Sequence, residues 1–138
     1  MEPQSTPRNT LCTQNDFPLK DITETIISCA MEVHSTIGPG LLESIYEEAL
    51  AHEFNLRQVH CERQKAISLK YKGKDIGNHR IDFLIENAVV LELKAVETMH
   101  RIYEAKVLTY LRALEIKVGL LINFNVVRLK EGIKRLIL

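Results

Sequence analysis

The feature that most constrains the fold is a pair of alternating segments between residues 79 and 95, separated by a short polar turn. Apolar residues occupy every second position of both segments: Ile81, Phe83, Ile85, then Val89, Leu91, Leu93 and Ala95. This period of two is typical of β-strands, because successive side chains point to opposite faces of a sheet. The sequence therefore predicts a β-hairpin with one apolar face. The opposite face carries Arg80, Asp82, Leu84, Glu86, Val90, Glu92 and Lys94.

The length of the turn decides which side chains face one another across the hairpin. With a three-residue loop, Glu86-Asn87-Ala88, Asp82 lies opposite Glu92. A two-residue loop would instead pair Asp82 with Leu93 and place a charge on the apolar face. Register is strongly specified where one face is buried, so we favour the three-residue loop. Opposed side chains on one face then lie about 4.5–5.5 Å apart at Cβ.

Two carboxylates at this separation repel one another unless a cation lies between them. Asp82 and Glu92, with Lys94 two residues beyond, therefore match a site that binds a divalent metal and activates water. The alternative is that these side chains are only solvated charges on the polar face of a hairpin. Spacing alone leaves both interpretations open.

The remaining pattern predicts an α/β domain of residues 19–138, with a central mixed sheet flanked by helices. Residues 1–18, rich in Pro and small polar residues, predict a flexible tail. Helices are expected at 21–36, with Asp21 near the N-cap, at 41–54 and at 97–114. Strands are expected at 59–62, 66–71, 117–124 and 133–138. The second helix is expected to bury Leu42, Ile45, Tyr46, Ala49 and Leu50.

Composition limits the class of protein. The chain has no apolar run that would span a bilayer and no secretory signal pattern, so we expect a cytoplasmic protein without a membrane partner. Cys12, Cys29 and Cys61 lack metal-ligand spacing and are expected as free thiols. Eighteen basic and eighteen acidic residues cancel, which counts against a strong nonspecific nucleic-acid binder. Basic residues nevertheless gather between Arg57 and Arg80, either as a local basic strip or as an ordinary solvated face.

Lys106 lies on the apolar stripe of the helix expected at 97–114, which also carries Met99, Ile102, Tyr103 and Tyr110. A lysine in such a place either extends its ammonium into water, with its stem on the apolar surface, or faces a functional site.

The segment 38–46, Gly-Pro-Gly-Leu-Leu-Glu-Ser-Ile-Tyr, combined with the hairpin, resembles the GxxExxY proteins. This prokaryotic group is placed in the PD-(D/E)XK nuclease superfamily. Gly40, Glu43 and Tyr46 match the named motif. Further matching stretches are 30–34, Gln64, 91–94, 110–111 and 119–124, so that the resemblance extends from about Leu19 to Ile137.

The resemblance implies a restriction-endonuclease-like αβββαβ core in which the site forms where two central strands diverge. The signature residues of the superfamily fall on Asp82, Glu92 and Lys94. The preceding helix often adds an acid, for which Glu43 is the first candidate and Glu47 the rival. Two departures are Ile81, where a proline commonly stands, and Lys106, where the family commonly has glutamine.

These implications predict a Mg²⁺- or Mn²⁺-dependent phosphodiesterase acting on nucleic acid, with DNA as the expected polymer. Asp82, Glu92 and the Leu93 carbonyl would bind the metal, and Lys94 would orient water or stabilise the transition state. Glu43 would tune the metal and Lys106 would contact a phosphate. The rival prediction is a nucleic-acid or protein interaction module that keeps the fold without catalysis. A homodimer through strand 117–124 or the last strand is compatible with both.

Overall fold

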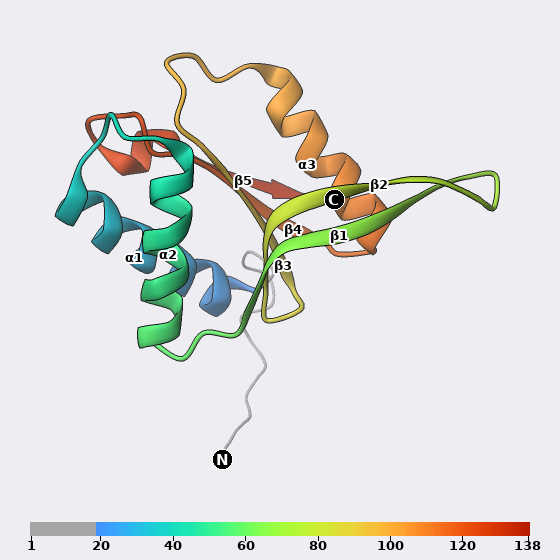
Figure 1. The fold of residues 1–138 in the computed structure, drawn as a ribbon, viewed down its shortest axis with the longest axis horizontal. Coiled ribbons are helices and arrows are strands. Elements are labelled where there is room, and N and C mark those ends of the chain that lie inside the picture. Colours follow the sequence, from blue (N-terminus) through green and yellow to red (C-terminus); the bar gives the residue numbers. More distant parts are fainter. Residues whose placement is uncertain (1–18) are drawn as a thin grey trace.

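A mixed sheet with helices on both faces forms the framework of residues 19–138, the part of the chain that the computed structural model describes (Figure 1). The tail expected at 1–18 lies outside the described residues. The helices are α1 (Lys20–Ile37), α2 (Glu43–Leu56), α3 (Arg101–Leu114) and the 3₁₀ helix η2 (Leu129–Gly132). The strands are β1 (Cys61–Tyr71), β2 (Lys74–Ile85), β3 (Val89–Lys94), β4 (Val118–Asn123) and β5 (Ile133–Ile137).

The sheet has five strands in the order β1-β2-β3-β4-β5. Strands β3 and β4 are parallel and are joined through α3, whereas the other neighbours are antiparallel. Between β2 and β3, Ile85 pairs with Val89 and Phe83 with Leu91. The three-residue loop at 86–88 and the register predicted from it are therefore confirmed, as is the α/β restriction-endonuclease-like architecture.

The central part of the sheet is buried on both faces. Helices α1 and α2 cover one face, with a core that includes Ile26, Tyr46, Leu50, Phe54, Phe83, Leu91, Leu120 and Phe124. Helix α3 covers the other face, with a core that comprises Ile67, Ile81, Leu84, Val90, Val107, Tyr110, Leu111 and Leu121. A sheet covered on both faces buries both sets of alternating residues.

This arrangement corrects the prediction that the hairpin has one apolar and one polar face. Leu84 and Val90, assigned to the polar face, are buried under α3. Ile81 also packs on the α3 side, whereas Phe83, two residues later, packs on the side of α1 and α2. The regular alternation of β2 is thus interrupted at Asp82, where the strand passes from one packing environment to the other.

The burial predicted for the second helix was partly wrong. Tyr46 and Leu50 are buried, but Leu42 is 72% exposed and Ile45 is 45% exposed. Because α2 begins at Glu43, Leu42 precedes the helix, and the residues that reach the core recur four apart at Tyr46, Leu50 and Phe54.

Several predicted boundaries also need correction. Residue 20 rather than 21 begins α1, and its N-cap is Leu19. The strands expected at 59–62 and 66–71 form the single strand β1, which continues through a left-handed backbone conformation at Gln64 with φ of 48°. The helix expected from 97 begins at Arg101.

Three further expectations concern the strands proposed for a homodimer, membrane-spanning helices and the cysteines. Strand β4 lies between β3 and β5, so only β5, of the two strands proposed for a homodimer, is an edge. No helix within residues 19–138 has the length and apolar character needed to cross a membrane. Cys29 and Cys61 are free thiols, while Cys12 lies outside the described residues.

Candidate active site

Asp82 and Glu92 meet where β2 and β3 stop pairing through their backbones. The last backbone pair between these strands is Phe83 with Leu91. One residue further on, the backbone N–H of Asp82 donates to Oε2 of Glu92 at 2.8 Å. In return, the backbone N–H of Leu93 donates to Oδ2 of Asp82 at 2.8 Å. Each carboxylate thus binds the backbone of the opposite strand, which holds both side chains at the point of divergence.

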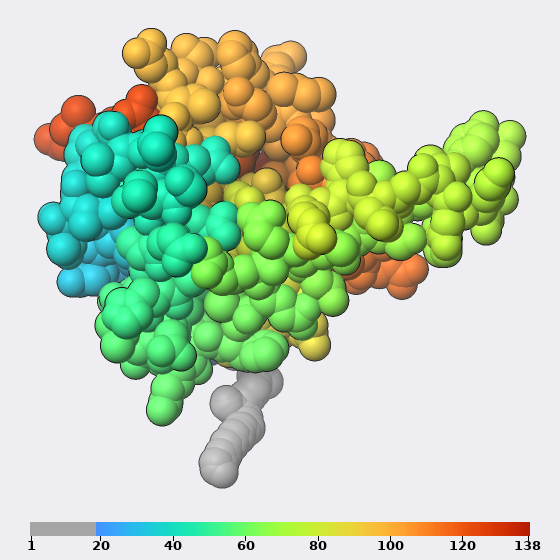
Figure 2. Space-filling model, viewed as in Figure 1, coloured from blue at the N-terminus to red at the C-terminus, as the bar shows by residue number. Residues whose placement is uncertain are grey.

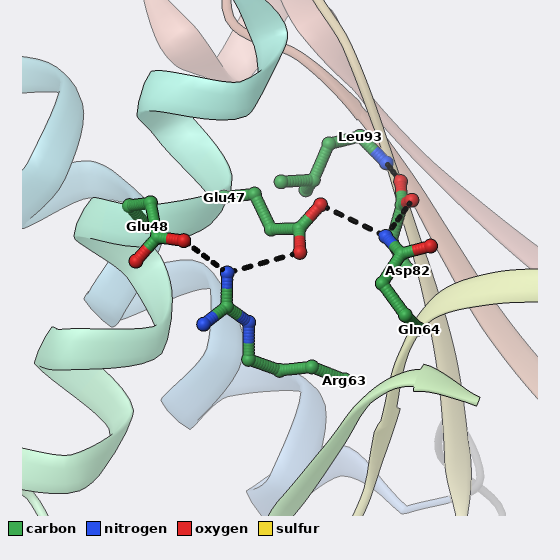
Figure 3. A network of polar contacts seen from close by, with 6 residues as sticks. All are labelled: Glu47, Glu48, Arg63, Gln64, Asp82 and Leu93. Atoms are coloured by element: carbon green, nitrogen blue, oxygen red, sulfur yellow. Dashed lines mark hydrogen bonds and ion pairs between the residues drawn. The ribbon is translucent and has the colours of Figure 1, made fainter.

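Side-chain hydrogen bonds from β1 connect Asp82 to helix α2 (Figure 3). Nε2 of Gln64 donates to Oδ1 of Asp82 at 3.3 Å and to Oε1 of Glu47 at 3.0 Å. The Arg63 guanidinium donates to Glu47 at 3.1 Å and to Glu48 at 2.8 Å. Gln64, held in its left-handed conformation, therefore bridges an acid of α2 and an acid of β2.

Glu43 lies in the first turn of α2, one helical turn before Glu47. Burial raises the pKa of Glu43, and the negative charges of Asp82 and Glu47 raise it further. Lys94 and Lys106 oppose this shift of the Glu43 pKa. Glu43 and Glu47 therefore both interact electrostatically with Asp82. Glu47 is also linked to Asp82 by hydrogen bonds, through the side chain of Gln64.

The carboxylates of the two strands are costly to ionise together. Burial, followed by the charge of Asp82, raises the pKa of Glu92 to about 8. The pKa of Asp82 is also raised, chiefly by burial, against the opposing effect of its hydrogen bond from Leu93. A bound cation would favour the charged forms of both groups.

Two lysines supply positive charge on this side of the sheet. The Nζ of Lys94 lies 4.3 Å from the ring centroid of Tyr103, and its charge lowers the pKa of Glu92 and of Asp82. Lys106 is exposed, yet its charge also lowers the pKa of Glu92. The structure therefore brings Lys106 within electrostatic reach of the carboxylates, although its side chain remains in contact with solvent.

Tyr110 and His79 were not proposed as site residues from the sequence, and the structure places both beside it. The Tyr110 hydroxyl lies 3.2 Å from Nδ1 of His79. Burial raises the pKa of Tyr110, and the charges of Glu92 and Asp82 raise it further. The available signal was spacing, because Tyr110 follows Lys106 by one helical turn and His79 precedes Asp82 on the same strand.

The residues present suit a metal ion that keeps several of its waters, as Mg²⁺ does, better than an ion bound entirely by protein side chains. Within residues 19–138, no group of three or more His, Cys, Asp or Glu side chains is arranged to hold a metal ion. The Leu93 N–H points toward β2, and in a strand the C=O of the same residue points to the same side, so this carbonyl is directed to the β2 side of β3. Two carboxylates and one carbonyl suit Mg²⁺, which keeps several waters and takes its remaining ligands from substrate phosphates.

The site lies in a depression of the surface. Figure 2 shows the molecule hollowed between α2 and α3, with residues of the central strands at the base of the hollow. Helix α2, which carries Glu43 and Glu47, and helix α3, which carries Lys106, border this hollow.

Comparison with known proteins gives one match. A model of the PD-(D/E)XK nuclease superfamily matches residues 20–136, almost all of the described chain. Neither the comparison with curated proteins nor that with solved structures found a match.

Proposed function

The chain belongs to the PD-(D/E)XK nuclease superfamily, and from this membership we propose that it is a metal-dependent nuclease whose site is formed by Asp82, Glu92 and Lys94. The observation that carries the proposal is the reciprocal hydrogen bonding of Asp82 and Glu92 at the divergence of β2 and β3. Two half-buried carboxylates that oppose one another's ionisation have a physical use there if a divalent cation joins them.

Asp82, Glu92 and the Leu93 carbonyl are the groups that would hold Mg²⁺ or Mn²⁺. A divalent ion bound there would polarise a phosphoryl oxygen and lower the pKa of a bound water. Lys94 would donate to that water or to the phosphate. Its Nζ lies 4.3 Å from the ring centroid of Tyr103, and its charge lowers the pKa of Glu92, which supports this role. Glu43, whose pKa is raised, would accept a proton. Lys106 would contact a substrate phosphate from helix α3.

We also propose that the chain is a member of the GxxExxY group. The motif has a structural explanation in this chain, which supports the assignment. Gly40 has a φ of 92°, which favours glycine, and the Tyr46 hydroxyl donates to the Gly38 carbonyl at 2.6 Å. The same hydroxyl accepts a hydrogen bond from the Leu41 N–H at 3.1 Å. Together these contacts fix the loop that precedes α2 and so the position of Glu43.

The test is cleavage of end-labelled DNA and RNA substrates with Mg²⁺ or Mn²⁺, comparing wild type with Asp82→Asn. We expect Asp82→Asn to lose at least about 100-fold in cleavage rate, the scale seen when a group that stabilises the transition state is removed. Asp21→Asn is the matched control, because Asp21 is an exposed acid of α1, and it should cleave like wild type.

Equal cleavage by Asp82→Asn and wild type would exclude this site as the source of activity. Binding of nucleic acid by wild type without cleavage of any substrate would instead favour the interaction module. With DNA as the expected polymer, preferential cleavage of RNA would correct the substrate but leave the site in place.

A further inference from the structure

The outer part of the β1–β2 hairpin leaves the body of the protein as an arm, defined here as residues 70–80 (Figures 1 and 2). All of its residues are exposed. Its two strands pair with each other alone, since β1 is an edge of the sheet and the pairing of β2 with β3 is confined to residues 83–85. A two-stranded ribbon in water is at best marginally stable, so its projection into solvent has no evident benefit for folding.

The arm concentrates positive charge in a chain whose net charge is zero. It carries four basic residues, Lys70, Lys72, Lys74 and Arg80, and one acid, Asp75, which gives a net charge of +3 with His79 neutral. Lys70 is paired with Asp75 at 2.6 Å, so the charges of Lys72, Lys74 and Arg80 are in excess over the acids of the arm. Two large apolar side chains, Tyr71 and Ile76, are about 60% exposed among these charges.

The arm is a direct extension of the strand that carries Asp82. Lys74 lies eight positions before Asp82 on β2, which at about 3.4 Å per residue spans about 27 Å. Arg80 braces the base of the arm, because its guanidinium donates to the Gln64 carbonyl at 2.7 Å. Gln64 in turn binds Asp82, so the base of the arm and the carboxylate site share one set of contacts.

We propose that this arm binds the phosphate backbone of duplex nucleic acid on one side of the cleavage site. The inference rests on the proposed function and deepens it, because it assigns a duplex as the substrate class. Along one strand of a duplex successive base pairs are about 3.4 Å apart, so the tip of the arm, about 27 Å from Asp82 along the strand, reaches roughly eight base pairs from the site. The major groove is about 12 Å wide and admits a two-stranded β-ribbon, which fits the shape of the arm.

The turn at the tip supports a role for its charge. Lys72 and Gly73 both have positive φ, of 50° and 84°, as a type I′ turn requires. Asparagine is favoured over lysine at the first of these positions because it tolerates the left-handed conformation. The lysine is thus a poor choice for the turn but places an ammonium at the end of the arm, where a phosphate would meet it.

Lys72 therefore allows a variant that removes charge and suits the turn, although it also removes the contact of the Lys72 ammonium with the Tyr71 ring, 5.3 Å from the centroid. The test variant combines Lys72→Asn, which suits the turn, with Lys74→Gln. The control combines Lys20→Gln and Lys130→Gln, which removes the same charge from α1 and η2, elements on the opposite side of the molecule from the arm. Binding of a fluorescein-labelled 24-base-pair DNA duplex is measured by anisotropy in EDTA, between 50 and 200 mM salt, so that no cleavage occurs.

We expect the plot of log affinity against log salt to become shallower by about 2 in the arm variant, since each lost phosphate contact removes about 0.9. The control should keep the slope of the wild type. An unchanged slope in the arm variant, or an equal change in the control, would overturn the proposal. An equal change on the single strand of the same length would overturn the assignment to duplex.

The outcome is separable from that of the proposed function. If the wild type binds the duplex through the arm but cleaves nothing with metal, the arm stands and the nuclease proposal fails. If cleavage depends on Asp82 while the arm variant binds like wild type, the nuclease proposal stands and the arm proposal fails. Absence of duplex binding by the wild type overturns the arm proposal as well.

Discussion

The protonation of Glu92 affects both the chemistry of the proposed site and the stability of the fold. Its pKa is raised to about 8, because burial and the neighbouring Asp82 both penalise the charged form. In the unfolded chain a glutamate titrates near 4.3. Between these values the folded state holds a proton that the unfolded state releases, so unfolding becomes easier as the pH rises.

We therefore predict that metal-free wild type loses stability as the pH rises from about 4.5 to about 8, and that Glu92→Gln loses less. Glutamine keeps an oxygen that can accept the hydrogen bond from the Asp82 N–H, but it does not ionise. Urea unfolding at several pH values in EDTA measures the difference. Parallel pH profiles for the two proteins would show that Glu92 is ionised at little cost in the folded state.

At the scale of the element, the loop before α2 depends on one buried hydroxyl. Tyr46 is buried, its ring stacks on Phe124 with centroids 4.6 Å apart, and its hydroxyl joins Gly38 to Leu41. The GxxExxY pattern thus describes a loop and the tyrosine that closes it. Glu43, which lies between the loop and the tyrosine, is thereby held close enough to Asp82 for the two charges to interact.

We predict that Tyr46→Phe destabilises the protein by about 1–3 kcal/mol, since the Leu41 N–H and the Gly38 carbonyl lose a partner. Urea unfolding measures the change. Tyr71→Phe is the matched control because Tyr71 is 61% exposed, and it should change stability by no more than about 0.5 kcal/mol. Equal stability of Tyr46→Phe and wild type would show that these hydrogen bonds contribute nothing.

The hairpin shows how far local pattern carries a prediction at this scale. Its register followed from alternation and the choice of a three-residue loop, because a two-residue loop would have placed a charge on the apolar face. The same alternation did not show that both faces are covered, although the apolar Leu84 and Val90 on the supposed polar face were the available signal. Whether the second face is covered depends on α3, which lies outside the hairpin in the sequence.

At the scale of the whole molecule, the fold class and the order of most elements could be predicted, because periodicity and turn residues are local properties of the chain. The contacts that complete the candidate site could not. Gln64 reaches Glu47 and Asp82 only because β1 crosses beside α2 with an irregular backbone. Tyr110 approaches Glu92 because α3 packs over the sheet, whereas its spacing from Lys106 shows only that the two side chains share one face of the helix.

The arrangement of the molecule also joins two surfaces of opposite character. Acidic side chains of α2, β2 and β3 interact with one another at the site, while the arm carries excess positive charge. Lys94 and Lys106 offset part of the charge of the site carboxylates, and a bound cation would neutralise more of it. A polyanion attracted to the arm would then meet less repulsion at the site. Binding of metal at the site and of nucleic acid at the arm are therefore expected to favour one another.

The central claim, that Asp82 and Glu92 form a divalent-cation site, is tested most directly by the melting temperature with and without millimolar Mn²⁺. A ligand that binds only the native state adds about 2.7 kcal/mol at a hundredfold excess over its dissociation constant. We expect Mn²⁺ to raise the melting temperature of wild type by several degrees and to leave that of Glu92→Gln unchanged. Equal responses of the two proteins, including no response in either, would contradict the claim.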